Sequence, residues 1–75
     1  MQINIGNLIR DELHRQHRTN AWLAEQLHID RRTLQRLYNK QSIDTQQLLR
    51  ISKILDKDFF HYYSEVLQGV ADVAT

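Results

Sequence analysis

The chain has no cysteine, no proline and only two glycines among its 75 residues. Without cysteine it has neither a disulfide framework nor a thiolate metal site, which fits a reducing compartment. Without proline, no helix of the chain is kinked or broken by a proline ring. No apolar run approaches the roughly 20 residues of a membrane span, and no basic segment followed by an apolar one opens the chain. We therefore expect one small cytoplasmic domain covering residues 1–75.

The net charge of +1 conceals an uneven distribution. Residues 10–40 contain seven Lys or Arg and four Asp or Glu, whereas residues 41–75 contain three and five. Positive charge is densest between residues 31 and 40. Such asymmetry favours a one-sided contact with a polyanion, although charge alone is equally compatible with an ordinary solvated surface.

Apolar spacing predicts helices throughout, so we expect an all-α domain. The first helix should run from Ile5 to Arg15, with Asn4 as its N-cap. Its inward stripe repeats every four residues, as an amphipathic helix requires. The stripe comprises Ile5, Ile9 and Leu13, with Leu8 beside it.

Residues 19–39 predict two short helices joined by a tight turn. Thr19 or Asn20 can cap the earlier helix, and Asp30 can cap the later one by accepting from the amide near Thr33. The charge of Asp30 also suits a helix N-terminus, which argues against a catalytic role for it. The apolar points that would pack the two helices are Leu23, Ala24, Leu27, Ile29, Leu34 and Leu37.

A fourth helix should span residues 44–56, because Asp44 opens a capping box in which Gln47 reaches back. Its apolar face is wide and comprises Leu48, Leu49, Ile51, Ile54 and Leu55. Asp58 should open a fifth helix. After Leu67 the pattern is lost, so we expect a tail from about residue 68 that is frayed, disordered or truncated.

The fifth helix begins with a run of aromatic residues, FFHYY. One small helical face cannot readily hide them all. We expect Phe59 and Tyr63 to join the core. Phe60 or Tyr62 would then be left for a homodimer surface.

In residues 31–37 the apolar residues are Leu34 and Leu37, and a row of polar residues lies on the helix face that does not pack inward. Arginine can pair two donors with guanine, and glutamine can pair with adenine in the same way. A short basic helix with this exposed row suits the major groove of DNA. The row is Arg31, Arg32, Gln35 and Arg36.

The segments IGNLIRDEL, TNAWLAEQLHIDRRTLQRL and DTQQLLRISKILD resemble the Cro and lambda-repressor-like (XRE) family over about residues 5–65. The resemblance implies a compact bundle of about five helices with a helix-turn-helix at about residues 19–39. It also implies a bacterial or phage-type transcription regulator that binds double-stranded DNA as a dimer. Base reading would then belong to Arg31, Arg32, Gln35 and Arg36, and backbone contact to Asn20, Thr33, Asn39, Lys40 and Ser42.

The chain departs from the family pattern at three positions. His28 stands where the turn usually holds glycine, because a positive φ is needed there. Tyr38 stands where many members place a glutamate that pairs with an arginine, here Arg10. Lys40 stands where a glycine usually follows. These changes affect the local ion pair and the loop, whereas the polar row is intact.

Other functions are less well supported by the sequence. His14 and His17 are three residues apart, but two ligands do not make a zinc site, and we expect no cofactor. No serine stands near a recognisable base, so we do not expect an enzyme. Trp22 either half-buries against the first helix or meets DNA or a partner. The alternative function is a protein-interaction module or antitoxin-like adaptor that meets an acidic partner.

Overall fold

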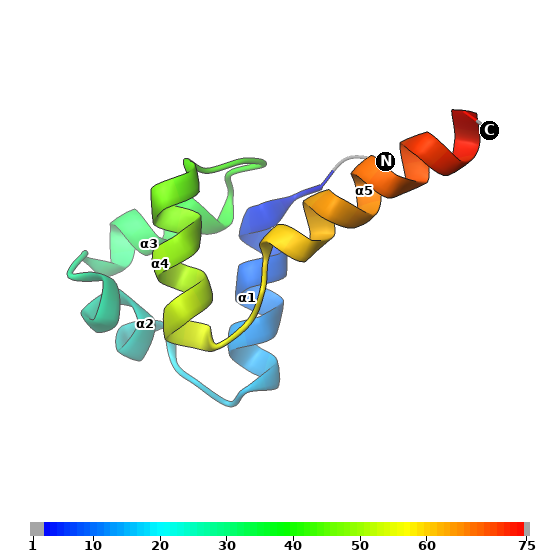
Figure 1. Cartoon of the computed structure of the whole chain (residues 1–75). Helices are drawn as coiled ribbons and strands as arrows, with labels where there is room; N and C mark the ends of the chain where they lie inside the picture. Colours follow the sequence, from blue (N-terminus) through cyan, green and yellow to red (C-terminus); the bar gives the residue numbers. More distant parts are fainter. Residues whose placement is uncertain (1–2, 75) are drawn as a thin grey trace.

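Five helices make up the part of the chain that the structure describes. This computed structural model describes the backbone of residues 3–74 and the side chains of residues 3–69, and within these residues it contains no strand. The helices are α1 (Ile5–Arg15), α2 (Asn20–Leu27), α3 (Arg31–Tyr38), α4 (Thr45–Leu55) and α5 (Phe60–Ala74) (Figure 1). The predicted all-α fold is confirmed at this level.

Each of the first four helices begins where a polar side chain caps its N-terminus. The side chain of the cap accepts a hydrogen bond from the amide three residues later, which satisfies one of the orphan donors of the first turn. The predicted caps are confirmed, and Thr19 is the cap of α2. The capping box predicted at Asp44 is incomplete, because among the described residues the Gln47 side chain makes no hydrogen bond back to Asp44. The caps and donors are Asn4 with Asn7, Thr19 with Trp22, Asp30 with Thr33, and Asp44 with Gln47.

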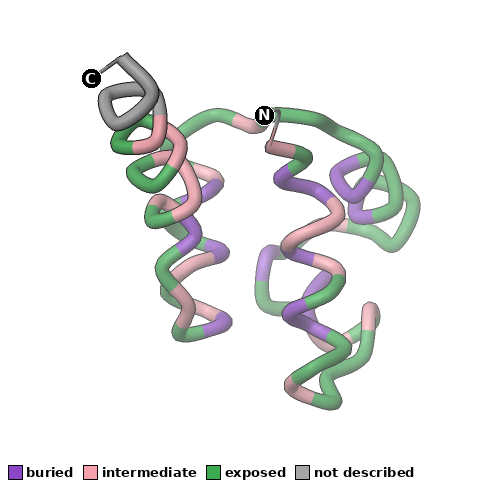
Figure 2. Tube along the Cα trace, turned by 90° about the vertical axis from the view of Figure 1, so that its right-hand side faces the viewer, coloured by how far each residue is buried: buried purple, intermediate pink, exposed green. Residues whose placement is uncertain are grey.

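The core lies between α1, α2, α3 and α4, and Figure 2 shows their buried segments turned toward one another. The stripe predicted for α1 is wholly buried, as Ile5, Ile9 and Leu13 each have no exposed surface. All the inward residues predicted for α2 and α3 are also buried, except Ile29, which is partly exposed. The remaining core residues are Leu23, Ala24, Leu27, Leu34, Leu37, Tyr38, Leu48, Ile51, Leu55 and Phe59.

The apolar face of α4 is narrower than we predicted. Leu48, Ile51 and Leu55 are buried, but Ile54 is only partly buried and Leu49 is 46% exposed. Leu49 follows Leu48 directly, so it points about 100° away around the helix and past the packed face. The prediction that Leu49 belongs to the core-facing side is therefore wrong.

α5 differs from the other helices because it projects away from them (Figure 1). Phe59, just before it, is wholly buried, whereas none of residues 60–69 is buried. Tyr63 is only partly buried, so its predicted place in the core is not fully realised. The helix begins at Phe60, two residues after Asp58, and it continues to Ala74 through the segment whose pattern looked lost.

The N-terminus of α1 is joined to the segment that follows α3. The amides of Ile5 and Gly6 donate to the carbonyl oxygens of Gln41 and Lys40, at 3.2 and 3.0 Å. Gly6 lies so close to the end of α3 that a Cβ atom there would come within 2.2 Å of the carbonyl oxygen of Tyr38. Glycine is required here because the two backbones are in direct contact.

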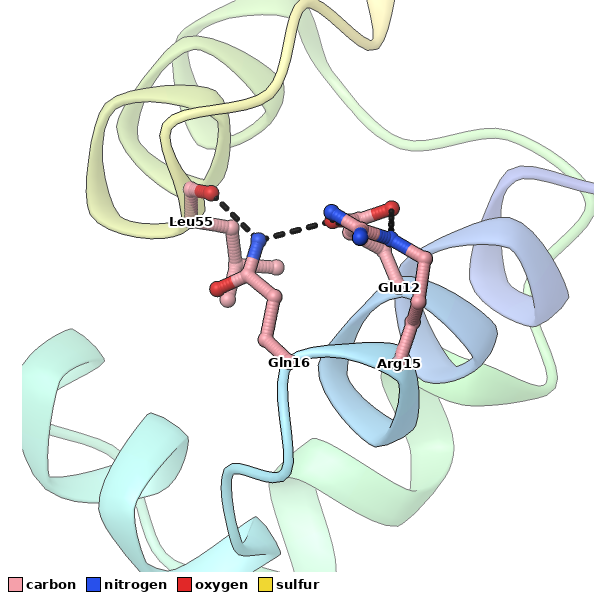
Figure 3. A network of polar contacts seen from close by, with 4 residues as sticks. All are labelled: Glu12, Arg15, Gln16 and Leu55. Carbon is pink, nitrogen blue, oxygen red and sulfur yellow. Dashed lines mark hydrogen bonds and ion pairs between the residues drawn. The ribbon is translucent and has the colours of Figure 1, made fainter.

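The C-terminus of α1 is joined to the end of α4 by a small polar network (Figure 3). Glu12 is only 6% exposed and accepts hydrogen bonds from the Arg15 guanidinium and from the Gln16 side chain. Gln16 also donates to the carbonyl oxygen of Leu55 at 2.7 Å. The bond from Arg15 holds the pKa of Glu12 below its ordinary value, against the opposing effect of burial.

Candidate nucleic-acid interface

The turn between α2 and α3 is built around His28. This residue has φ 57° and ψ 41°, the left-handed conformation that we predicted for this position. The conformation lets the amides of His28 and Ile29 donate back to the carbonyl oxygens of Glu25 and Ala24, which closes the end of α2. Arg50 of α4 also donates to the carbonyl oxygen of Leu27, at 3.3 Å. These bonds fix the direction in which α3 leaves the turn.

α3 has one face in the core and one in water. Leu34, Leu37 and Tyr38 are buried and hold the helix against α1 and α2. Because 3.6 residues make one turn, Arg32, Arg36 and Asn39 share a line on the opposite side. Gln35 and Arg31 lie on the row beside that line. All four residues predicted to read bases, Arg31, Arg32, Gln35 and Arg36, are exposed. Thr33 and Asn39, which we predicted to contact the DNA backbone, are exposed as well.

Two of the three arginines of α3 stand in an unfavourable electrostatic setting, whereas Arg36 lies in the last turn, where a cation is favourable. Arg31 and Arg32 occupy the first turn, where the helix dipole is positive and disfavours cations. In the part of the chain that the structure describes, neither they nor Arg36 form an ion pair with a carboxylate. Asp30 is the nearest acidic group in sequence, and its carboxylate already accepts from the Thr33 amide at 2.7 Å, which lowers the pKa of Asp30.

A polar contact joins the start of α2 to the end of α3. The hydroxyl of Tyr38 donates to Oδ1 of Asn20 across 2.9 Å. Tyr38 is 2% exposed, and burial raises its pKa to about 12, although the charge of Arg10 opposes this shift. The charge of Arg10 thus acts on a tyrosine at the position where many members of the resembled family place a glutamate.

The three residues that we predicted to contact DNA backbone after α3 lie in or next to an exposed loop. Asn39 caps the end of α3, and Lys40 and Ser42 follow it; all three side chains are exposed. The loop backbone is held to α1 through the carbonyl oxygen of Lys40. The structure therefore places Asn39 and Lys40 directly beyond the arginine row, and Asn20 contacts Tyr38, the last residue of α3.

Trp22 is half-buried against the core, one of the two alternatives that the sequence left open. Its ring also lies 4.4 Å from the guanidinium carbon of Arg18, a distance at which cation–π attraction operates. Arg18 belongs to the loop between α1 and α2. The pair therefore anchors that loop on α2.

Sequence reasoning missed the role of Tyr38. We treated it as a departure from a family pattern, but it is one of the largest fully buried side chains in the protein. The signal was present, because Leu37 and Tyr38 follow Leu34 by three and four residues, which is the inward spacing of a helix.

The histidines do not form a metal site. α1 ends at Arg15 and His17 has a φ of 58°, so His14 and His17 do not lie on one helix, as their spacing had suggested. Among the described residues, no group of three His, Cys, Asp or Glu could hold a metal ion. In the same part of the chain, no helix is both long and apolar enough to cross a bilayer.

Comparison with known proteins adds no relative to these observations. No family model, no curated protein and no solved structure matches the chain. What the chain does must therefore be inferred from its own residues and geometry.

Proposed function

We propose that this protein is a sequence-specific double-stranded DNA-binding protein, a cytoplasmic transcription regulator of helix-turn-helix type. In this proposal α2 and α3 are the two helices of that motif, and α3 enters the major groove. Arg31, Arg32, Gln35 and Arg36 read bases. Contacts with the phosphate backbone come from Asn20, Thr33, Asn39, Lys40 and Ser42. The protein acts by binding, without catalysis and without a cofactor.

The observation that carries the proposal is the contrast between the two faces of α3. One face is fixed in the core by three buried residues, and the other presents three arginines and a glutamine to solvent. A rigid helix with this polar row has the donors that recognise base edges in the major groove. Because no carboxylate of the described residues pairs with the arginines, they are available to bases and phosphates.

Selection from a random pool of duplex DNA at about 0.1 M salt tests the proposal, because this salt partly suppresses contacts made with the backbone alone. We expect enrichment of a short sequence, arranged as an inverted repeat if the protein binds as a dimer. If no sequence is enriched, and retention falls uniformly as salt rises, base reading is excluded.

Replacing Arg32 with alanine should weaken binding to the selected duplex by about 1–3 kcal/mol and relax sequence choice at one position. Lys53→Ala is the matched control, because it removes one positive charge from the exposed surface of α4. Titration of both variants with the selected and a scrambled duplex measures the effect. Equal losses in the two variants would show that Arg32 contributes only general charge.

A dimer is proposed through α5, where the apolar surface is incompletely covered. Phe60 and Tyr62 are partly buried, and Leu67 is 72% exposed. Tyr62 also contacts Phe59 and Lys57, with its ring 6.3 Å from that of Phe59. Light scattering over a range of concentrations should show a dimer that Leu67→Lys dissociates. A monomer at all concentrations would exclude this role for α5.

The same exposed surface of α5 supports a second candidate, a protein-interaction module. In this candidate the arginines of α3 would bind an acidic partner protein. The DNA selection separates the two candidates. An adaptor without DNA specificity would enrich no sequence, whereas a regulator that also binds a partner would enrich one.

A further inference from the structure

The contact between Tyr38 and Asn20 joins two residues that are 18 positions apart in the sequence. Asn20 is the first residue of α2, and Tyr38 is the last residue of α3. The tyrosine ring is held in the core, where it is 2% exposed, whereas Asn20 is only partly buried. A fixed donor thus meets a side chain that reaches the surface.

The chemistry of the two groups determines what remains free. A carboxamide has one oxygen that accepts and one NH₂ group with two donors. Because the Tyr38 hydroxyl donates to Oδ1, the oxygen has a partner within the protein, whereas the Nδ2 group has no acceptor among the described residues and stays free to donate to a ligand. A tyrosine hydroxyl is protonated at neutral pH, and burial raises the pKa of Tyr38 to about 12, so this hydroxyl can also donate well into the alkaline range.

We propose that Tyr38 is a positioning residue for DNA binding: it orients the carboxamide of Asn20 so that the Nδ2 donors face a phosphate of the duplex. This inference rests on the proposed function, because it supplies the geometry of one of its backbone contacts. Tyr38 itself touches no DNA and acts only through Asn20.

The surroundings of Asn20 suit an anionic oxygen. Thr19 caps α2 by accepting from the Trp22 amide. The amides of Asn20 and Ala21, also in the first turn, have no acceptor among the described residues. These amides carry the positive end of the helix dipole, which favours an anion nearby. A carboxamide held with its donors outward adds hydrogen bonds that a freely rotating one would make only part of the time.

Two single substitutions separate orientation from stability. Tyr38→Phe removes only the hydroxyl, and we expect binding to the selected duplex to weaken about 3- to 10-fold, the range of one hydrogen bond. Tyr63→Phe is the matched control, because Tyr63 lies on α5 and is no part of this contact. Asn20→Asp keeps an oxygen for Tyr38 to donate to but replaces the donors with negative charge.

The expected effects of Asn20→Asp on DNA binding and on stability have opposite signs. The dipole of α2 favours an acidic residue in the first turn, so the thermal midpoint of the Asn20→Asp variant should equal or exceed that of the wild type. Its duplex affinity should fall by more than about 10-fold, because two donors are lost and a carboxylate faces a phosphate. A variant that were merely misfolded would lose both properties together.

A double-mutant cycle with Asn20→Ala decides whether Tyr38 acts through Asn20. We expect Tyr38→Phe to cost nothing further in the Asn20→Ala background. An equal loss in both backgrounds would overturn the inference. So would full affinity of Asn20→Ala while Arg32→Ala remains impaired, a result that leaves the proposed function intact. If the wild-type protein selects no DNA, both the proposed function and this inference fail.

Discussion

α1 and α3 use their polar groups in opposite ways. The first amides of α1 donate to the loop that follows α3, and its buried Glu12 binds Arg15 and Gln16 near the end of the helix. The first turn of α3 instead holds Arg31 and Arg32, both exposed and, among the described residues, without a carboxylate partner. These groups of α1 are satisfied within the protein, whereas Arg31 and Arg32 of α3 face outward.

The helix dipole makes the difference energetic as well as geometric. Arg15 lies in the last turn of α1, where a cation is favourable, whereas Arg31 and Arg32 lie at the end of α3 that disfavours one. A sequence selected only for stability would follow the acidic cap Asp30 with further acidic residues in the first turn of α3, and not with arginines. Charge that opposes stability is expected where a surface is used for binding.

The largest effect should follow from breaking the contact between α1 and α3 at Gly6. In Gly6→Ala the added methyl group would meet the carbonyl oxygens of Tyr38 and Leu37, at 2.2 and 2.6 Å, so the helices must separate. We expect a loss of about 3 kcal/mol, at the upper end of overpacking effects, and a fall in the thermal midpoint of more than about 10 °C.

Gly69→Ala is the control for this prediction. A Cβ atom on Gly69 would meet nothing within 4 Å, and alanine is the better helix former there. Circular dichroism melts of the two variants provide the measurement. If Gly6→Ala unfolds at the wild-type temperature, the close approach of α1 and α3 is not a determinant of the fold.

A smaller loss should follow from neutralising Glu12, the buried carboxylate of α1. Glu12→Gln removes the ion pair with Arg15 and weakens a network that also holds Gln16, at a cost of about 1–2 kcal/mol near neutral pH. Arg15 itself is largely exposed, so its own loss is screened by water.

The cost of Glu12→Gln should also depend on pH in a defined direction. The folded pKa of Glu12 lies below its ordinary value of 4.5, so its contribution is complete above 4.5 and is lost as pH falls through the folded pKa. The difference between wild type and variant should therefore shrink from pH 7 to pH 3. Glu25→Gln, at an exposed position of α2, is the control, and a constant difference would contradict the assignment.

How far the sequence predicted this fold depended on how local each signal is. The caps Asn4, Thr19, Asp30 and Asp44 act on amides three residues away, so their positions follow from the sequence alone. The periodicity of Ile5, Ile9 and Leu13 is equally local.

The features that sequence reasoning missed depend on distant partners. Gly6 is required because α3 ends against it, and the Tyr38 hydroxyl finds Asn20 only when α2 and α3 are packed. The burial of Glu12 likewise depends on α4, whose Leu55 carbonyl completes the network. The candidate DNA-binding row was found because it occupies the face of α3 left free by a local pattern.

Relieving the strained turn that precedes α3 should stabilise the protein moderately. His28 has a positive φ, which costs a residue with a Cβ atom about 1–2 kcal/mol relative to glycine. Glycine gives back part of this gain through its greater freedom when unfolded, so His28→Gly should raise stability by about 1 kcal/mol. Urea denaturation measures the change, and a destabilised His28→Gly would mean that the His28 side chain has a structural role of its own.

The smallest effect tests the difference between α1 and α3 most directly, by removing one arginine from each. Arg31→Gln removes a cation from the unfavourable end of α3 and should raise stability by about 0.3–1 kcal/mol. Arg15→Gln removes one from the favourable end of α1, and it also removes the partner of Glu12, so stability should fall. Urea denaturation gives the sign of the stability change for each variant, and titration with the selected duplex gives the sign of the change in affinity. If Arg31→Gln binds DNA less well but unfolds at a higher denaturant concentration than wild type, the charge of Arg31 serves binding at the expense of stability. If it unfolds at a lower concentration, Arg31 stabilises the fold and the contrast with α1 fails.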